Sequence, residues 1–230
     1  MKADMWAPET PDAGPEPAKR RQILDGARRV FLAGGFDGAS MNDIARVAGV
    51  SKGTLYVYFD SKESLFEALI REHRQQQAER FVFPIGAAGP REQLAAFGRQ
   101  LISTITRPER MALMRIVIAA TNKFPSLGRT FYESGPCYGE KMLARHMEAW
   151  RDAGRLQFDD GETAARHFLG LCKSGVFTAC LFGVNDTASP EAIGESIDRA
   201  VEAFMRAYGA PQSSAASMSP ASEAGASVGA

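Results

Sequence analysis

Apolar residues recur along most of this chain at intervals of three and four positions, the spacing of one face of an α-helix. The first example lies within 18–33, where Ile23, Leu24, Ala27, Val30 and Phe31 fall on a single face. No run of residues alternates between apolar and polar with the period of two that marks a half-buried strand. The pattern therefore predicts an all-α protein of about nine helices.

Capping residues, glycines and prolines predict where these helices begin and end. Gly34 and Gly35 are expected to end the first helix, and Pro136 is expected to kink or break a later one. Ser40 and Ser51 are expected to cap the second and third helices. The predicted helices cover 18–33, 40–48, 52–58, 61–83, 90–106, 108–122, 125–152, 160–183 and 189–208.

Two of these helices carry more apolar surface than one neighbour obviously covers. The span 160–183 is apolar on several sides. The last helix has one apolar stripe, formed by Ile193, Ile197, Val201, Phe204 and Tyr208. Two explanations are open: the surface pairs with a second copy of the chain, or it packs within an intrachain core. The amount of apolar surface favours a homodimer.

Composition sets the two ends of the chain apart from the helical part. Residues 1–16 are rich in proline and acidic residues, and 209–230 in small and polar ones, so both are expected to be disordered tails. No stretch resembles a signal peptide or a membrane span, so we expect a cytoplasmic protein that does not contact a membrane. The chain has three cysteines, an odd and small number that predicts no disulfide framework.

Charge argues against one kind of interaction and for another. The formal net charge of the 230 residues is zero, so the whole chain has no bulk attraction for nucleic acid or membranes. Between positions 19 and 74, however, the sequence has ten basic and seven acidic residues, an excess of three positive charges. This segment therefore has the local positive charge that binding to a phosphate-carrying partner requires.

The most specific local pattern lies in 40–59, where two short predicted helices are joined by a turn at Gly49. This arrangement is typical of a helix-turn-helix, whose second helix enters the major groove of DNA. Leu55 and Phe59 are four residues apart and are expected to anchor that second helix to its neighbours. The side chains of Lys52, Thr54, Tyr56 and Tyr58 are then mostly directed away from this anchor, and Gly53 allows the backbone to approach a phosphate closely.

The two tyrosines have two interpretations. Tyr56 and Tyr58 either pack partly buried in the fold or donate their hydroxyls to phosphate oxygens, and we favour the phosphate contact. Lys52 and Thr54 are the better candidates for reading bases, because lysine meets guanine acceptors and threonine meets a thymine methyl group.

Residues 17–77 resemble the N-terminal DNA-binding domain of TetR-type transcription regulators through ILDGARRVFLAGGFDGASMNDIARVAGVSKGTLYVYFDSKESLFEAL. The resemblance implies a three-helix helix-turn-helix domain, which the fourth helix links to a helical ligand-binding and dimerisation domain over 78–208. It also implies a homodimer that reads the two half-sites of a palindromic operator in double-stranded DNA. By this resemblance, the DNA contacts come from Met41, Asn42, Lys52, Gly53, Thr54, Tyr56, Tyr58 and Lys62.

The later part of the chain resembles the regulatory domain of the AefR-like branch of that family, through RIVIAATNKFPSLGRTFYESGP and HFLGLCKSGVF. The resemblance implies a pocket for a small-molecule effector and a four-helix bundle between two subunits. Candidate pocket residues on the middle helices are Met114, Arg115, Phe131, Tyr132, His146, Trp150, Phe168 and Cys172. Arg115 stands out because a cation within an apolar helix needs a partner.

These patterns favour a ligand-responsive transcription regulator, with a repressor as the leading hypothesis. The alternatives are a constitutive DNA-binding regulator and an activator. An enzyme is disfavoured because the sequence lacks the nucleophile, phosphate-loop and metalloprotease motifs. The three histidines show no metal-ligand spacing, so neither a metal nor a cofactor is expected.

Overall fold

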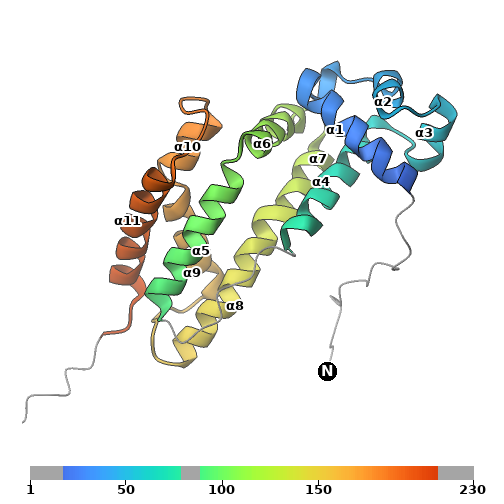
Figure 1. The fold of residues 1–230 in the computed structure, drawn as a ribbon. Helices are drawn as coiled ribbons and strands as arrows, with labels where there is room; N and C mark the ends of the chain where they lie inside the picture. Colours follow the sequence, from blue (N-terminus) through green and yellow to red (C-terminus); the bar gives the residue numbers. More distant parts are fainter. Residues whose placement is uncertain (1–17, 79–88, 212–230) are drawn as a thin grey trace, which may run out of the picture.

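The computed structural model describes residues 18–78 and 89–211, and within these ranges the protein is built from helices (Figure 1). The only strand-like pairing in the described ranges is an isolated antiparallel bridge between Leu156 and Gly209. The all-α prediction is therefore confirmed. The helices are α1 (Ala18–Gly38), α2 (Met41–Ala48), α3 (Lys52–Tyr58), α4 (Lys62–Ala78), α5 (Pro90–Ile105), α6 (Pro108–Thr121), α7 (Pro125–Tyr132), η1 (Glu133–Cys137), α8 (Tyr138–Asp152), α9 (Gly161–Lys173), α10 (Val176–Leu181) and α11 (Pro190–Tyr208).

Two spans predicted as single helices are divided in the structure. The disruption expected at Pro136 takes the form of η1, a π-helical segment between α7 and α8, because proline cannot donate the helical hydrogen bond. The prediction for 160–183 was wrong in its continuity: α9 ends at Lys173, and Gly175 has a positive φ of 81° before α10 begins. These two divisions account for the difference between nine predicted helices and the observed number.

The first helix departs from its predicted end. Its conformation breaks at Gly35, which has φ 69° and ψ −176°, but a further turn continues to Gly38 and buries Phe36. The predicted end of the fourth helix near position 83 lies outside the described residues, as do 1–16 and most of 209–230. At the start of that last segment, the amide of Ala210 donates a hydrogen bond to the carbonyl of Arg155 at 3.2 Å.

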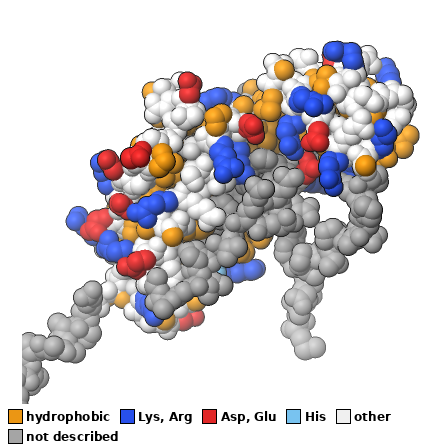
Figure 2. Space-filling view, in the orientation of Figure 1, with side chains coloured by type: hydrophobic (Ala, Val, Ile, Leu, Met, Phe, Trp, Pro, Cys, Tyr) orange, Lys and Arg blue, Asp and Glu red, His pale blue; other side chains and the backbone are white. Residues whose placement is uncertain are grey.

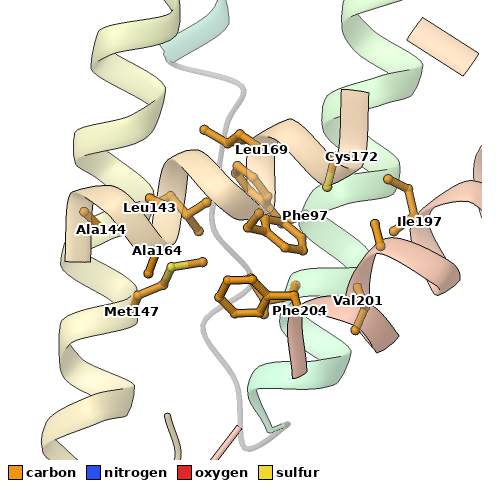
Figure 3. Packing of buried hydrophobic residues seen from close by; sticks show 14 of the residues in the cluster. Phe97, Leu143, Ala144, Met147, Ala164, Leu169, Cys172, Ile197, Val201 and Phe204 are labelled. Atoms are coloured by element: carbon orange, nitrogen blue, oxygen red, sulfur yellow. The ribbon is translucent and has the colours of Figure 1, made fainter. Parts of the chain in front are cut away.

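One core holds together the part of the molecule that we call the body, namely α5 and α8 to α11 (Figure 3). Phe168 of α9 packs against both Phe97 of α5 and Phe204 of α11, and Phe168 and Phe204 are fully buried. The rings of Phe168 and Phe204 pack edge to face at 5.3 Å between centroids. Met147 adds an α8 side chain to the same core.

The stripe on the last helix belongs to this intrachain core. Ile193, Ile197, Val201 and Phe204 are all buried by other elements of the same chain, chiefly α5 and α9. Of the two explanations left open for the stripe, the structure therefore supports the intrachain core. The stripe gives no support to a dimer, because its apolar surface is already covered.

A second core lies under the part that we call the head, residues 18–70, and it draws on α6 and α7 as well. Phe31, Phe36 and Phe66 form its aromatic centre, and Val117 of α6 and Leu127 of α7 are buried in the same cluster. Figure 1 shows α6 and α7 between the head and the remaining helices. The head is thus packed directly onto two helices that come much later in the sequence.

The approach of α1 to α2 leaves no room at Gly26. A Cβ atom placed there would lie 2.6 Å from Ala48 Cβ and 2.7 Å from Ala48 Cα. We expect Gly26→Ala to lower the free energy of unfolding by about 1–3 kcal/mol in a urea titration, because the two helices must separate. Gly139→Ala on α8 is the matched control, since its Cβ would meet nothing within 4 Å. A Gly26→Ala protein as stable as this control would contradict the close packing.

Candidate nucleic-acid interface

The helix-turn-helix is built by local capping that its sequence specifies. Ser40 accepts a hydrogen bond from the amide of Asp43 at 3.1 Å, and Ser51 accepts one from the amide of Thr54 at 3.0 Å. Gly49 ends α2 in the left-handed region with φ 66°, which a residue with a side chain rarely adopts. One free amide at the start of each short helix is therefore satisfied by its capping serine, and Gly49 closes the end of α2.

The charges of α2 reinforce the capping. The Ser40 hydroxyl donates to the carboxylate of Asp43 at 2.6 Å, and the Arg46 guanidinium donates to it at 2.8 Å. The Ser40 hydrogen bond, followed by the Arg46 one, lowers the pKa of the Asp43 carboxyl. The carboxylate near the amino end of α2 also suits the helix dipole.

Helix α1 braces the far end of α2. The Gln22 side chain donates to the carbonyl of Ala48 at 2.6 Å, and Arg29 donates to the carbonyl of Val47 at 3.0 Å. Both acceptors are among the last carbonyls of a helix, which have no partner inside it. The orientation of α2, and of the turn that follows, is therefore fixed by side chains from a neighbouring helix.

Helix α3 divides into a buried and an exposed side. Leu55 is fully buried and Phe59, just after the helix, is 5% exposed, as expected for the anchors. Lys52 and Gly53 are exposed, and Tyr56 is 43% exposed. The anchoring side faces the head core, so the opposite side of α3 is free to meet a large partner.

The remaining predicted contacts of α2 and α3 are more enclosed. Thr54 and Tyr58 are half-buried, and the Thr54 hydroxyl lies 2.8 Å from that of Ser51, so it already has a partner. At the start of α2, Asn42 is exposed and Met41 is half-buried against the head core. The structure thus places all of these residues on or beside the helix-turn-helix.

Lys62 is engaged within the head. Its ammonium donates to the carbonyls of Phe36 at 2.8 Å and Ala39 at 3.0 Å, and lies 4.5 Å from the centroid of the Phe36 ring. These carbonyls lie where the chain leaves α1, so the lysine caps that end. A phosphate contact by Lys62 stays a prediction, but the side chain has a structural role that the sequence did not suggest.

Val57 is an exposed residue of α3 that sequence reasoning missed. With 81% of its surface exposed, it is the most open of the large apolar side chains in the described part of the chain. A helical projection would have found it, because at 100° per residue Val57 lies opposite both Leu55 and Phe59. An apolar side chain in that place can contact the methyl groups of thymines.

Basic side chains surround this surface. Figure 2 shows Lys and Arg side chains gathered on the head, where α1, α2 and α3 lie. Lys19 and Arg21 are exposed at the start of α1, and the Arg20 guanidinium lies 5.3 Å from the centroid of the Phe59 ring. The local positive charge expected from the sequence is therefore carried by the head.

The eight predicted pocket residues do not form a single site. Trp150, Phe168 and Cys172 are buried in the body core, whereas Phe131 packs against the head core. Tyr132 is 53% exposed and Arg115 is exposed, while Met114 and His146 are half-buried. The effector pocket thus stays a prediction for the members that share the body core.

Burial controls the titration of two of these residues. It raises the pKa of the Cys172 thiol to about 12, so this cysteine stays protonated near neutral pH. It lowers the pKa of the half-buried His146 side chain. In the described part of the chain, no group of three or more His, Cys, Asp or Glu side chains could hold a metal ion, and no helix is long and apolar enough to cross a membrane.

A pocket of about 320 Å³ lies elsewhere, between the carboxyl-terminal part of α1 and helix α6. Of the eight predicted residues, only Arg115 lines it. The lining residues are Gly34, Gly35, Phe36, Asp37, Arg115, Ile116, Ala119 and Ala120.

Comparison with known proteins gives matches over nearly all of the described chain. Residues 23–69 match the model of bacterial regulatory proteins of the tetR family, and 92–210 match the AefR-like transcriptional repressor C-terminal domain. The chain is 27% identical over 166 residues to the HTH-type transcriptional repressor Rv1474c of Mycobacterium tuberculosis, which covers 72% of this chain and 84% of that protein.

Two solved structures are similar over most of their length. A TetR-family regulator from Mesorhizobium loti is 30% identical, with a TM-score of 0.76, covering 84% of this chain and 97% of that one. The flavonoid-responsive regulator FrrA is 36% identical, with a TM-score of 0.74 and the same coverage of 84% and 97%.

The two lysines of the helix-turn-helix region are expected to differ in their effect on stability. We expect Lys62→Met to lower the free energy of unfolding by about 2–3 kcal/mol in a urea titration, because two carbonyls lose a charged donor. Lys52→Met is the control and should stay within about 0.5 kcal/mol of the parent, since Lys52 is exposed. Equal stability of the two variants would argue against the cap at the end of α1.

Proposed function

The chain belongs to the TetR family of bacterial transcription regulators and is a DNA-binding regulator, and from this we propose that it binds a palindromic operator as a homodimer and is released by a small molecule. The observation that carries the proposal is the exposed side of α3, where Lys52, Tyr56 and Val57 point away from the head core. Two such helices fit half-sites one turn of DNA apart, about 34–36 Å.

The residues of this surface divide into two roles. Tyr56 and Tyr58 donate hydroxyl groups to phosphate oxygens and position the head without reading sequence. Lys52 and Val57 meet base edges, lysine at guanine acceptors and valine at thymine methyl groups. Asn42 at the start of α2 and Lys62 at the start of α4 add contacts to the sugar-phosphate backbone of the DNA. Affinity and sequence preference therefore depend on different side chains.

Control by a small molecule is proposed on a narrower basis. A relative 36% identical to this chain is named a flavonoid-responsive regulator, which supports a small lipophilic effector here as well. Repression is supported by the repressors among the relatives. The alternatives are a constitutive regulator and an activator. Because the chain belongs to a family of transcription regulators, an enzymatic function is disfavoured. Such a regulator would act in the cytoplasm.

The homodimer is proposed to use surface other than the α11 stripe. Phe182 is 78% exposed and Val184 is 76% exposed, and both lie in the connection between α10 and α11. Burying two such side chains against a second copy would stabilise a dimer by about 2–3 kcal/mol each. This connection is therefore the part of the body that we assign to the subunit interface.

DNA binding can be tested by fluorescence anisotropy with duplexes from the region upstream of the protein's own coding sequence. We expect affinity to fall at least about 100-fold between 50 and 200 mM salt, because phosphate contacts release counterions.

Two variants separate the proposed roles of the α3 side chains. Tyr58→Phe should weaken binding about threefold to tenfold on every operator variant, whereas Lys52→Ala should change the order in which the operator variants rank by affinity. Failure to bind any of these duplexes, or unchanged affinity of Tyr58→Phe, would contradict the assignment. Binding that no effector alters would identify a constitutive regulator.

The oligomeric state can be tested by sedimentation at micromolar concentration. We expect a mass twice the 24.9 kDa of one chain. The double variant Phe182→Ser, Val184→Ser should raise the dissociation constant of the dimer at least about tenfold, because both apolar contacts are lost. Leu32→Ser on α1, which removes a 37% exposed side chain from the head, is the control and should leave it unchanged. A monomeric parent protein would reject the homodimer.

A further inference from the structure

Four of the residues that line the pocket between α1 and α6 are small. Gly34 and Gly35 form its side on α1, and Ala119 and Ala120 form part of its side on α6. A Cβ atom placed on either glycine would meet nothing within 4 Å, so the space above the break in α1 is open. Neighbouring helices with larger side chains at these positions would fill that space.

The walls of the pocket are apolar. Phe36 lies just beyond the break in α1, and Ile116 stands beside the two alanines on α6. The volume of about 320 Å³ is at the lower end of the range for small-molecule sites. The backbone of two glycines and the half-buried side chain of Ile116 suit a flat, aromatic molecule of one or two rings.

The rim carries one cation with no ion-pair partner in the described part of the chain. The Arg115 side chain donates its Nε hydrogen to the carbonyl of Leu181 at 2.8 Å and an Nη2 hydrogen to that of Cys180. These bonds fix the guanidinium at the end of α10 and use two of its five N–H groups. The remaining N–H groups of Arg115 can bind an anion.

The other charged group on the rim is already balanced. The carboxylate of Asp37 lies 3.2 Å from the ammonium of Lys123, so the pair leaves little net charge beside the pocket. Arg115 is therefore the charged lining residue whose charge no ion pair in the described part of the chain balances. A carboxylate would be attracted there, because guanidinium binds a carboxylate through two parallel N–H groups.

We propose that this pocket binds a small planar aromatic anion, with its ring against Gly34, Gly35 and Ile116 and its acidic group on Arg115. Such a ligand would touch α1 of the head and α6 together, at the place where the two are packed against each other. It is separate from the predicted effector residues Trp150, Phe168 and Cys172, which lie in the body core.

The probe for this proposal is 2-naphthoate, titrated by ligand-detected nuclear magnetic resonance without DNA. We expect a dissociation constant on the order of 0.1–1 mM, typical of a ligand of this size. Gly34→Leu places a side chain in the open space and should weaken binding at least tenfold. Gly139→Leu on α8 also enters open space and should leave binding unchanged.

A local readout locates the bound probe. Ala119→Cys in a Cys137→Ser background introduces a thiol at the pocket, while the buried Cys172 and Cys180 stay protected from maleimide. We expect 2-naphthoate to slow maleimide labelling of that thiol several-fold, and its neutral analogue 2-naphthamide to slow it much less. No binding to the parent protein, or equal binding to Gly34→Leu without protection of the thiol, would overturn the proposal. Because no step uses DNA, failure to bind an operator would leave this result standing.

Discussion

The attachment of the helix-turn-helix head to the rest of the molecule depends on one aromatic contact, the packing of Phe36 at the end of α1. Its ring centroid lies 5.3 Å from that of Phe66 on α4 and 4.9 Å from that of Phe124 at the start of α7. Lys62 covers the same ring and caps the carbonyl of Phe36. Aromatic side chains bury large areas and prefer such edge-to-face geometry, so the end of α1 is fixed against α4 and α7 at once.

This contact explains how the head is connected to the rest of the molecule. The body core contains neither Phe36 nor its neighbours, so the two cores are separate packing units. Between them, α6 contributes Val117 to the head core, while Arg115 of the same helix holds the end of α10. A shift of α6 or α7 therefore changes the surroundings of α1 directly. A conformational change in the body can therefore reach the head through the packed helices α6 and α7.

Much of the fold followed from local chemistry. Ser40, Gly49 and Ser51 place α2 and α3 correctly because a cap acts within three or four residues of the group it satisfies. The apolar pairing of Leu55 with Phe59 likewise identified the buried side of α3, although the exposure of Val57 on the opposite side was missed. The continuity of 160–183 was misjudged because apolar content alone does not reveal the positive φ at Gly175.

The sequence by itself determined the helical class, the helix-turn-helix and the identity of the side chains on α3, since each rests on contacts between residues close along the chain. Only the tertiary structure decided which surfaces those helices share. It covered the α11 stripe within the chain, distributed the predicted pocket residues over two cores, and turned Lys62 toward the carbonyls of α1. These outcomes depend on packing between segments far apart in sequence, and a periodic pattern shows that a face is apolar without showing what covers it.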